Sequence, residues 1–410
     1  MYKNSSVLGV YNRFDFEPTR GDSAYLYRED GSKVLDFAGA IAVNVLGYNN
    51  KIVERAMLKQ LNKGFFSQSN LFYNEEQETL AKKLCKKAGF YDIKNAQIKI
   101  TGKAFFCNSG AEANELAIKI ARKRYNTLCE RDYNEIICFT NAFHGRTIAT
   151  ISAVQRKKLT FGFEPLLTGF KIAEFNNIKS VEKLITEHTS AVMLETIQGE
   201  GGITPCNIKF LQELRKLCTF HKIGLILDEV QCGNGRSGTY FAYEKYGIKP
   251  DIVTTAKGIA GGLPMGACII NEEFAKYMPV GSHGCTFGGN ALCCCVANAV
   301  FDILSNKKCL AHVEKIGNSL LAMLKMLSSK YNDIIQSVSG TGLMVGIKIR
   351  DEINNRKFAE ILLSNGLSSA PASNNTIRFL PPLIINERHI KEAERIIKVS
   401  IAQLKIIERY

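Results

Sequence analysis

The chain has 410 residues, of which 46% are hydrophobic, and its formal net charge is +14. This length exceeds the roughly 250 to 300 residues at which single hydrophobic cores stop growing, so we expect more than one structural unit. The lysines are scattered along the chain rather than gathered into one basic block with interleaved aromatic residues, so no nucleic-acid partner is expected.

The N-terminal stretch MYKNSSVLGVYNRF lacks the uninterrupted apolar segment of a secretory signal. The thirteen cysteines are irregularly spaced and form no C-x-x-C pair, so we expect neither a metal site nor a disulfide framework. The longest uncharged stretch, residues 286–301, is shorter than the ~20 apolar residues of a membrane span. These features predict a cytoplasmic protein with reduced thiols and without a membrane partner.

Short β-rich runs alternate with helical patterns between about residue 80 and residue 270. The runs are KAFFCN (103–108), NEIICF (134–139), SAVMLE (190–195), KIGLILDEV (222–230), DIVTTA (251–256) and MGACII (265–270). This alternation predicts an α/β fold in which helices cover both faces of a mostly parallel sheet. Ligands of such sheets gather at the carboxyl ends of the strands. Four polar residues fall at these ends: Asn108, Glu195, Asp228 and Lys257.

The first of these runs leads into CNSGAEANELAIKIARKRY (107–125), which supplies a strand end, a glycine and a helix in that order. At the start of this helix, the backbone amides of Gly110 and Ala111 can bind a phosphate. A structural alternative stays open, because Ser109 and Glu112 form an S-x-x-E capping box that would use some of the same amides.

The second run is followed by NAFHGRT (141–147). Here Phe143 can stack on a flat ring, and Arg146 can bind a carboxylate through its planar guanidinium. The alternatives are a core phenylalanine and a solvated arginine.

Asp228 and Lys257 form the most informative pair. Asp228 directly follows the apolar strand Ile223–Leu227 and is therefore delivered to the ligand edge of the sheet. Lys257 is the only charged residue in TTAKGIAGGLPMGA (254–267). A lysine in apolar surroundings tends to lose its proton and becomes a nucleophile toward carbonyl carbon; the alternative is an ammonium that reaches solvent along its stem. Pyridoxal phosphate would suit both side chains, since its pyridine needs a carboxylate and its aldehyde needs an amine.

The loop GNGRSG (233–238) matches the dinucleotide fingerprint G-x-G-x-x-G and follows a strand. However, Asp228 and Glu229 would place negative charge beside a pyrophosphate, and the match lies in mid-chain rather than in a first β-α unit. We interpret the loop as a tight turn. A dinucleotide-binding dehydrogenase remains the alternative from a different class of enzyme.

The remaining segments predict a second, smaller α/β unit. Apolar residues recur at helical spacing over Val313–Leu327, residues 334–349 are typical of paired strands, and a last helix carries apolar residues from Ile390 to Leu404. We expect an N-terminal segment over residues 1–70 that joins the small domain, a large cofactor-binding domain over 71–300, and a C-terminal small domain over 301–410.

Six motifs occur in the order FCNSGAEANE, FHGRT, ETIQGEGG, LDEVQCGNGRSG, AKGIAGGLPMGA and TFGGNALCC. LDFAGAIAVNVLG (35–47) precedes them and TIRFLPPL (376–383) follows. Over nearly the whole chain, these motifs resemble the class III aminotransferases, which use pyridoxal 5′-phosphate and have the type I fold of such enzymes. The resemblance implies that an amino group passes from a small-molecule donor to 2-oxoglutarate.

The resemblance also implies roles for individual residues. Lys257 would carry the cofactor covalently, and Asp228 would hold its pyridine nitrogen. Thr286 is similar to a threonine that reaches the cofactor phosphate of the neighbouring subunit, which implies a homodimer with a shared active site. The further cofactor contacts would come from Ser109, Gly110, Ala111, Phe143, Glu229, Val230 and Gln231.

For the substrate, Arg146 resembles an arginine that binds a carboxylate. Arg378 resembles a second carboxylate clamp, and Glu200 a glutamate that masks this clamp. Cys285 stands where family members often carry a small hydroxyl residue. Within the family, the resemblance is greatest to enzymes that act on N2-acetylornithine in arginine biosynthesis. Ornithine, succinylornithine, succinyldiaminopimelate and 4-aminobutyrate stay open as donors, and a non-catalytic carrier of the cofactor stays open as a function.

Overall fold

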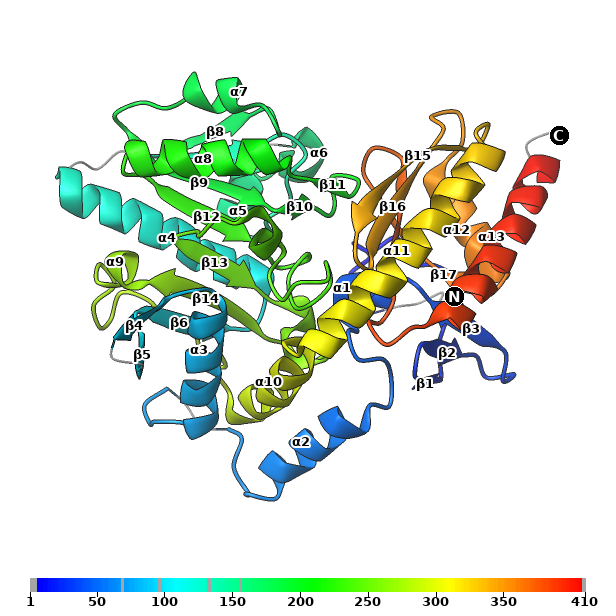
Figure 1. Cartoon of the computed structure of the whole chain (residues 1–410), viewed down its shortest axis with the longest axis horizontal. Helices are drawn as coiled ribbons and strands as arrows, with labels where there is room; N and C mark the ends of the chain where they lie inside the picture. Colours follow the sequence, from blue (N-terminus) through cyan, green and yellow to red (C-terminus); the bar gives the residue numbers. More distant parts are fainter. Residues whose placement is uncertain (1–5, 68–69, 95–96, 131–133, 155, 408–410) are drawn as a thin grey trace.

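The computed structural model describes residues 6–67, 70–94, 97–130, 134–154 and 156–407. Its central element is a seven-stranded sheet in the order β6-β14-β13-β12-β9-β7-β8 (Figure 1). These strands are β6 (Gly102–Cys107), β7 (Glu135–Phe139), β8 (Phe170–Ala173), β9 (Thr189–Glu195), β12 (Gly224–Asp228), β13 (Ile252–Thr255) and β14 (Gly266–Asn271). Only β14 runs antiparallel to its neighbours. The predicted mostly parallel sheet is therefore confirmed.

Strand β12 illustrates why the sequence forms this sheet. Leu225 and Leu227 belong to the core on one face, whereas Ile226 belongs to the core on the other face. A strand that is buried on both faces needs apolar residues at every position, so its sequence shows a continuous run instead of an alternation.

Helices cover the two faces of the sheet. On one face, α8 (Ile208–Phe220) packs through apolar residues at helical spacing, including Leu211 and Leu214. On the other face, α4 (Gly110–Cys129) packs through residues such as Ala117 and Ile120. The other helices of this part are α3 (Glu75–Lys87), α5 (Ile148–Ser152), α6 (Lys157–Thr160), α7 (Ile178–Glu182), η1 (Ala242–Tyr246), η2 (Lys257–Ala260), α9 (Glu272–Ala275) and α10 (Ala291–Leu304).

Both ends of the chain contribute to a second unit, at the right of Figure 1. In one sheet β3 (Lys33–Asp36) pairs with β17 (Leu367–Ser368), so residues near the two termini lie side by side. This sheet also contains β1 (Arg20–Asp22) and β2 (Tyr25–Tyr27). An antiparallel sheet contains β15 (Ile335–Thr341), β16 (Met344–Ile349), β18 (Ala370–Ala372) and β19 (Thr376–Phe379). The helices are α11 (Lys307–Lys330), α12 (Asn355–Ser364) and α13 (Glu387–Ile407).

A continuous helix, α10, spans the position at which the boundary between the two units was predicted. The predicted boundary near residue 300 falls within α10 (Ala291–Leu304), and α2 (Lys51–Leu61) from the N-terminal segment packs against that helix. A short helical element, α1 (Gly39–Ala42), precedes α2. Two short ribbons complete the fold: β4 (Tyr91–Lys94) with β5 (Gln97–Ile100), and β10 (Ile197–Gln198) with β11 (Thr204–Pro205).

Within the described ranges, no helix has both the length and the hydropathy that a membrane crossing requires. All thirteen cysteines are free thiols.

Candidate active site

The carboxyl ends of β12 and β13 open into a cavity of about 470 Å³. Asp228 is the last residue of β12, and Lys257 follows β13 after Ala256. Asp228 lies opposite Thr254 in the parallel register, so neighbouring strands supply the two side chains. The predicted site residues that line the cavity are Ser109, Gly110, Ala111, Phe143, Arg146, Asp228, Val230, Gln231 and Lys257.

A buried network holds the Asp228 carboxylate. Its Oδ2 accepts a hydrogen bond from Asn114 Nδ2 at 2.8 Å and another from His144 Nδ1 at 2.8 Å. Asn114 is itself fixed, because its Oδ1 accepts from the Thr254 hydroxyl at 2.6 Å. Burial disfavours the charged form of His144, but the hydrogen bond to Asp228 and the charge of Asp228 outweigh it and raise the His144 pKa. The carboxylate is therefore oriented before any ligand binds.

Glu195, the last residue of β9, places a second acid beside this network. Its two oxygens accept hydrogen bonds from the backbone amides of Phe143 and Gly199, each at 2.9 Å. Burial and then the charge of Asp228 raise the pKa of Glu195 to about 7. Glu195 thus ties together the two loops that carry Phe143 and Glu200.

Lys257 has unusual backbone and electrostatic properties. Its φ is 51°, in the left-handed region that side chains other than glycine rarely adopt, and such strain is concentrated at functional positions. The side chain is only partly exposed, and it lies within range of the charge of Arg378. Burial and then this positive charge lower the Lys257 pKa to about 8. At pH 7 roughly a tenth of such amines are neutral and nucleophilic.

The start of α4 has features of both interpretations of its sequence. Only one half of the predicted capping box is present: Ser109 Oγ accepts from the Glu112 amide at 3.3 Å. The Glu112 side chain accepts from the Ser109 hydroxyl at 2.8 Å and from the Asn108 amide at 3.0 Å instead of from the Ser109 amide. This cap uses the amide of Glu112 and leaves those of Gly110 and Ala111, which have no acceptor within the helix. A Cβ on Gly110 would lie 2.6 Å from Val230 Cγ1, so glycine is needed for this close approach. The helix is therefore capped by Ser109, and its first amides stay free for an anion.

These groups fit pyridoxal phosphate. The amides of Gly110 and Ala111 would hold the phosphate at the helix N-terminus. The pre-oriented carboxylate of Asp228 would hold the protonated ring nitrogen, and Lys257 supplies the amine for the aldehyde. Phe143 presents an aromatic ring to the same cavity.

Beside the cavity, β19 contributes Arg378, which is 1% exposed. Its guanidinium contacts Glu200 Oε2 at 3.0 Å and donates to Gln231 Oε1 at 3.3 Å. Burial lowers the Arg378 pKa. Arg146 differs because it is exposed, and its guanidinium carbon lies 5.6 Å from the centre of the Phe143 ring. In this protein one arginine is therefore masked by a carboxylate and the other is open.

The structure does not bring Glu229 to the cavity. Its carboxylate accepts hydrogen bonds from the Thr196 hydroxyl at 2.6 Å and from the Ala242 amide at 2.7 Å. A third bond comes from the amide of Tyr243 at 3.2 Å. Because protein donors surround this carboxylate, it anchors the adjoining loops instead of facing the cavity as the sequence suggested.

Cys285 and Thr286 also lie outside this cavity. Both line a neighbouring cleft of about 570 Å³. Asn108 Nδ2 donates to Cys285 Sγ at 3.2 Å, so the thiol sits beside the start of α4. Thr286 is exposed.

Sequence reasoning gave no role to Asn114 or His144, although both contact Asp228. The available signal for Asn114 is an amide on the buried face of an amphipathic helix, where it is 1% exposed. His144 lies within FHGRT, between the two residues that the sequence did single out.

The three glycine amides of the GNGRSG loop already have acceptors within the protein. Gly233 donates to the Glu229 carbonyl at 3.0 Å, Gly235 to that of Tyr240 at 3.1 Å, and Gly238 to that of Gly235 at 3.0 Å. These bonds support the interpretation of the loop as a tight turn.

The chain belongs to the class III aminotransferases: residues 9–401 match the family model described as Aminotransferase class-III. It is 42% identical over 383 residues to the acetylornithine aminotransferase of Methanocaldococcus jannaschii, a match that covers 93% of this chain and 92% of the relative. It is 39% identical over 388 residues to the acetylornithine/succinyldiaminopimelate aminotransferase of Buchnera aphidicola, covering 94% and 92%.

Among solved structures, the ornithine aminotransferase of Toxoplasma gondii has a TM-score of 0.89 and 26% identity, and the match covers 98% of this chain and 94% of that one. That structure has PLP at partial occupancy in its active site. The similarity of the two folds agrees with the conclusion that the residues of the cavity fit pyridoxal phosphate.

Proposed function

We propose that this protein uses pyridoxal phosphate to move the δ-amino group of N2-acetylornithine to 2-oxoglutarate, giving N-acetylglutamate 5-semialdehyde and glutamate. The observation that carries the proposal is the placement of Asp228 and Lys257 at the ends of adjacent parallel strands, in one cavity with a helix N-terminus. The choice of an acetylated donor is supported by two relatives whose names include acetylornithine.

When bound, pyridoxal phosphate supplies the aldehyde that takes up the amino group and the ring that accepts the electrons of the broken C–H bond. The negative charge of Asp228 would keep the ring nitrogen protonated, and Asn114 and His144 hold the carboxylate in place for this role. Lys257 takes up the proton released from the donor carbon that bears the amino group, since its pKa of about 8 suits a general base near neutral pH.

The two arginines would distinguish the substrates. Arg146 is open and would hold the α-carboxylate of the acylated donor, so that the distance to Lys257 selects the δ-amine. Glu200 masks Arg378 in the structure, and we expect this ion pair to persist while the acylated donor is bound. For 2-oxoglutarate, Glu200 would move aside and expose Arg378 to the carboxylate beside the keto group.

The proposed enzyme is a cytoplasmic homodimer that serves arginine biosynthesis. A dimer is supported by large apolar side chains close to the cleft of Cys285 and Thr286: Leu71 is 85%, Phe72 71% and Phe287 72% exposed. A second copy over this region would bury them and bring Thr286 to the partner's phosphate site. Thirteen free thiols agree with a reducing compartment.

The test is a comparison of initial rates with a panel of amino donors at fixed 2-oxoglutarate. We expect kcat/KM to be highest for N2-acetylornithine. The other donors in the panel are ornithine, succinylornithine, succinyldiaminopimelate and 4-aminobutyrate. A higher kcat/KM for ornithine would overturn the proposal that the donor is acylated, but the protein would still be a transaminase.

The variant Arg146→Gln tests the proposed carboxylate clamp. It should raise KM for the acylated donor roughly tenfold, because a charged hydrogen bond is lost.

The visible absorbance of the holoprotein tests catalysis itself. If none of the donors changes this absorbance, the protein is a non-catalytic carrier of the cofactor.

A further inference from the structure

The masked arginine of the active site lies where the two units of the fold meet. Its partner Glu200 is at the tip of the hairpin formed by β10 and β11, and Arg378 is on β19 of the smaller unit. Figure 1 shows this hairpin beside β15, and Ser339 of β15 donates to the carbonyl of Ile203 in the hairpin at 2.6 Å. The ion pair between Glu200 and Arg378 therefore joins the two units.

Arg378 is the fixed partner of this ion pair. Its guanidinium donates to the carbonyl of Ala370 at 3.4 Å and to that of Pro371 at 3.2 Å, in addition to Gln231. In contrast, the side chain of Glu200 is 32% exposed. Among the residues that the structure describes, Arg378 is the only ion-pair or hydrogen-bond partner of the Glu200 carboxylate. When the pair separates, Glu200 is therefore the side chain that moves.

The smaller unit holds the backbone at Glu200. The amide of Ser373 donates to the Glu200 carbonyl at 3.1 Å, and Asn374 Nδ2 donates to the Gly201 carbonyl at 2.9 Å. Both donors belong to the turn between β18 and β19. The turn that leads into the strand of Arg378 thus also binds the loop of Glu200.

The larger unit holds the same loop from the other side. The amide of Gly199 donates to Glu195 Oε2 at 2.9 Å, and Gln198 Nε2 donates to the carbonyl of Thr140 at 2.8 Å. Each of the residues 198–201 therefore has a hydrogen bond to another segment of the chain. The loop cannot shift as a whole unless it loses some of these bonds.

Asn374 has the properties that its place in the turn requires. Its φ is 54°, in the left-handed region, which asparagine tolerates better than most residues do. It is exposed, and it is not among the residues that line the active-site cavity. Its side chain can therefore act on the reaction only through the loop that it holds.

We propose that Asn374 is a positioning residue for the ion pair between Glu200 and Arg378. Because it fixes the backbone beside Glu200, less conformational entropy is lost when the ion pair forms. The pair then opens by rotation of the Glu200 side chain and not by movement of the loop. This inference rests on the proposed function, in which glutamate and 2-oxoglutarate need an open Arg378 and the acylated donor does not.

The experiment compares two half-reactions of the holoenzyme, one with glutamate and one with N2-acetylornithine as the amino donor. The absorbance of the cofactor gives the second-order rate constant of each, and the ratio of the glutamate constant to the N2-acetylornithine constant reports how readily Arg378 is unmasked. We expect Asn374→Gly to raise this ratio roughly threefold, because a hydrogen bond that favours the masked state is lost. Glycine adopts a positive φ without strain, so the turn is preserved.

Asn49→Gly is the matched control. Asn49 is also exposed and also has a φ of 54°, but its Nδ2 donates to Asp22 at 3.3 Å instead of to the loop of Glu200. This variant should leave the ratio unchanged. A second test variant, Asn374→Asp, keeps the shape of the side chain but has no N–H to donate. It should raise the ratio as Asn374→Gly does.

A double variant separates this role from a general loosening of the fold. Glu200→Gln removes the charge that masks Arg378 and should itself raise the ratio. Addition of Asn374→Gly to Glu200→Gln should give no further rise, because the two residues act through the same contact.

Three results would overturn the proposal. If the ratio rises in Glu200→Gln but stays unchanged in both Asn374 variants, Asn374 has no positioning role and the proposed function stands. If Asn374→Gly raises the ratio as much in the Glu200→Gln background as alone, Asn374 does not act through Glu200. If Glu200→Gln leaves the ratio unchanged, the masking of Arg378 in the proposed function is wrong, and the role of Asn374 with it.

Discussion

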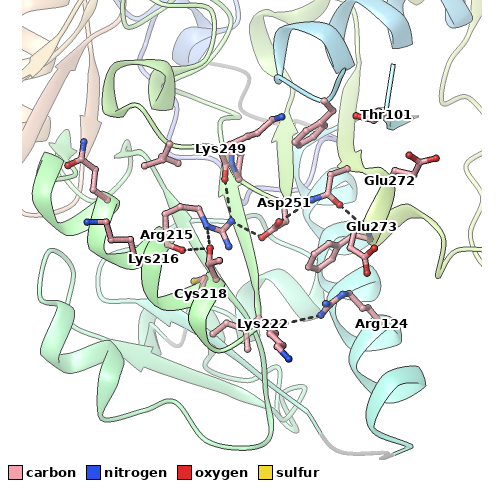
Figure 2. A pocket seen from close by; sticks show the side chains of 18 of the residues that line it. Thr101, Arg124, Arg215, Lys216, Cys218, Lys222, Lys249, Asp251, Glu272 and Glu273 are labelled. Atoms are coloured by element: carbon pink, nitrogen blue, oxygen red, sulfur yellow. Dashed lines mark hydrogen bonds and ion pairs between the residues drawn. The ribbon is translucent and has the colours of Figure 1, made fainter. Parts of the chain in front are cut away.

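The two edges of the central sheet use the same strands for different chemistry. At the carboxyl edge, Asp228 is 3% exposed, and both of its oxygens accept hydrogen bonds from the protein. At the amino edge, the side chain of Asp251 is 18% exposed and pairs with Arg215, while lysines around it face solvent. Burial gives the first edge a lysine with a lowered pKa, whereas the lysines of the second edge, which line a cleft around the Arg215–Asp251 pair (Figure 2), are exposed. The length of the strands thus separates the buried Asp228 and the partly buried Lys257 from the exposed charges around Asp251.

The largest predicted loss of transaminase activity follows substitution of Lys257. Lys257→Ala removes both the cofactor attachment and the base, so steady-state transamination should fall by roughly 10³-fold or more. Initial rates with N2-acetylornithine measure this loss; turnover within tenfold of the unmodified enzyme would remove Lys257 from the mechanism.

The pH dependence of cofactor uptake tests the electrostatic difference. A lysine whose pKa is lowered to about 8 is neutral above that pH and becomes protonated as the pH falls through it. The rate at which apoprotein attaches pyridoxal phosphate should therefore rise on the order of fiftyfold between pH 6 and pH 8 and then level off. Stopped-flow absorbance measures this rate. A rise that continues to pH 10 would show an ordinary exposed lysine.

Asn114→Ala should affect catalysis through Asp228. The variant removes one of the two donors to Asp228 Oδ2. We expect kcat and the affinity for pyridoxal phosphate each to fall about tenfold, with KM for the donor unchanged, because a hydrogen bond to a charged group is lost. Thr254→Val removes only the hydrogen bond that fixes Asn114. It should also lower kcat and the affinity for pyridoxal phosphate, but by less. Unchanged cofactor affinity in both variants would exclude the positioning role.

The smallest effect on activity is expected at the amino edge. Asp251→Asn removes the ion pair with Arg215 and should lower the free energy of unfolding by about 1 kcal/mol. The transaminase rate should stay the same, because none of the described residues that line the cleft at this edge also lines the active-site cavity. Chemical denaturation and initial rates together check this, and a tenfold loss of rate would contradict the separation of the two edges.

Much of this arrangement follows from the sequence. The continuous apolar runs that end at Glu195 and Asp228 predicted strands β9 and β12, because strands buried on both faces cannot alternate. Strand β8 (Phe170–Ala173) was not predicted, since FKIA is only four residues long and two of them are partly exposed. The positions of Asp228 and Lys257 could be predicted because Asp228 ends its strand and Lys257 comes two residues after the end of the next one.

The contacts around Asp228 could not be predicted in the same way. Asn114 and His144 are 114 and 84 residues from Asp228 in the chain, and no local pattern specifies such a contact. Glu229 shows the converse. Its sequence position beside Asp228 suggested the cofactor, but successive residues after a strand point in different directions, and its carboxylate faces Thr196 and Ala242.

Reduction of the holoprotein with borohydride, followed by peptide mass mapping, tests the central claim most directly. The treatment fixes the cofactor to whichever amine carries it. We predict a single pyridoxyl group, on the peptide that contains Lys257, and weaker cofactor retention before reduction in Asp228→Ala. A pyridoxyl group on any other lysine would contradict the assignment of this cavity as the active site.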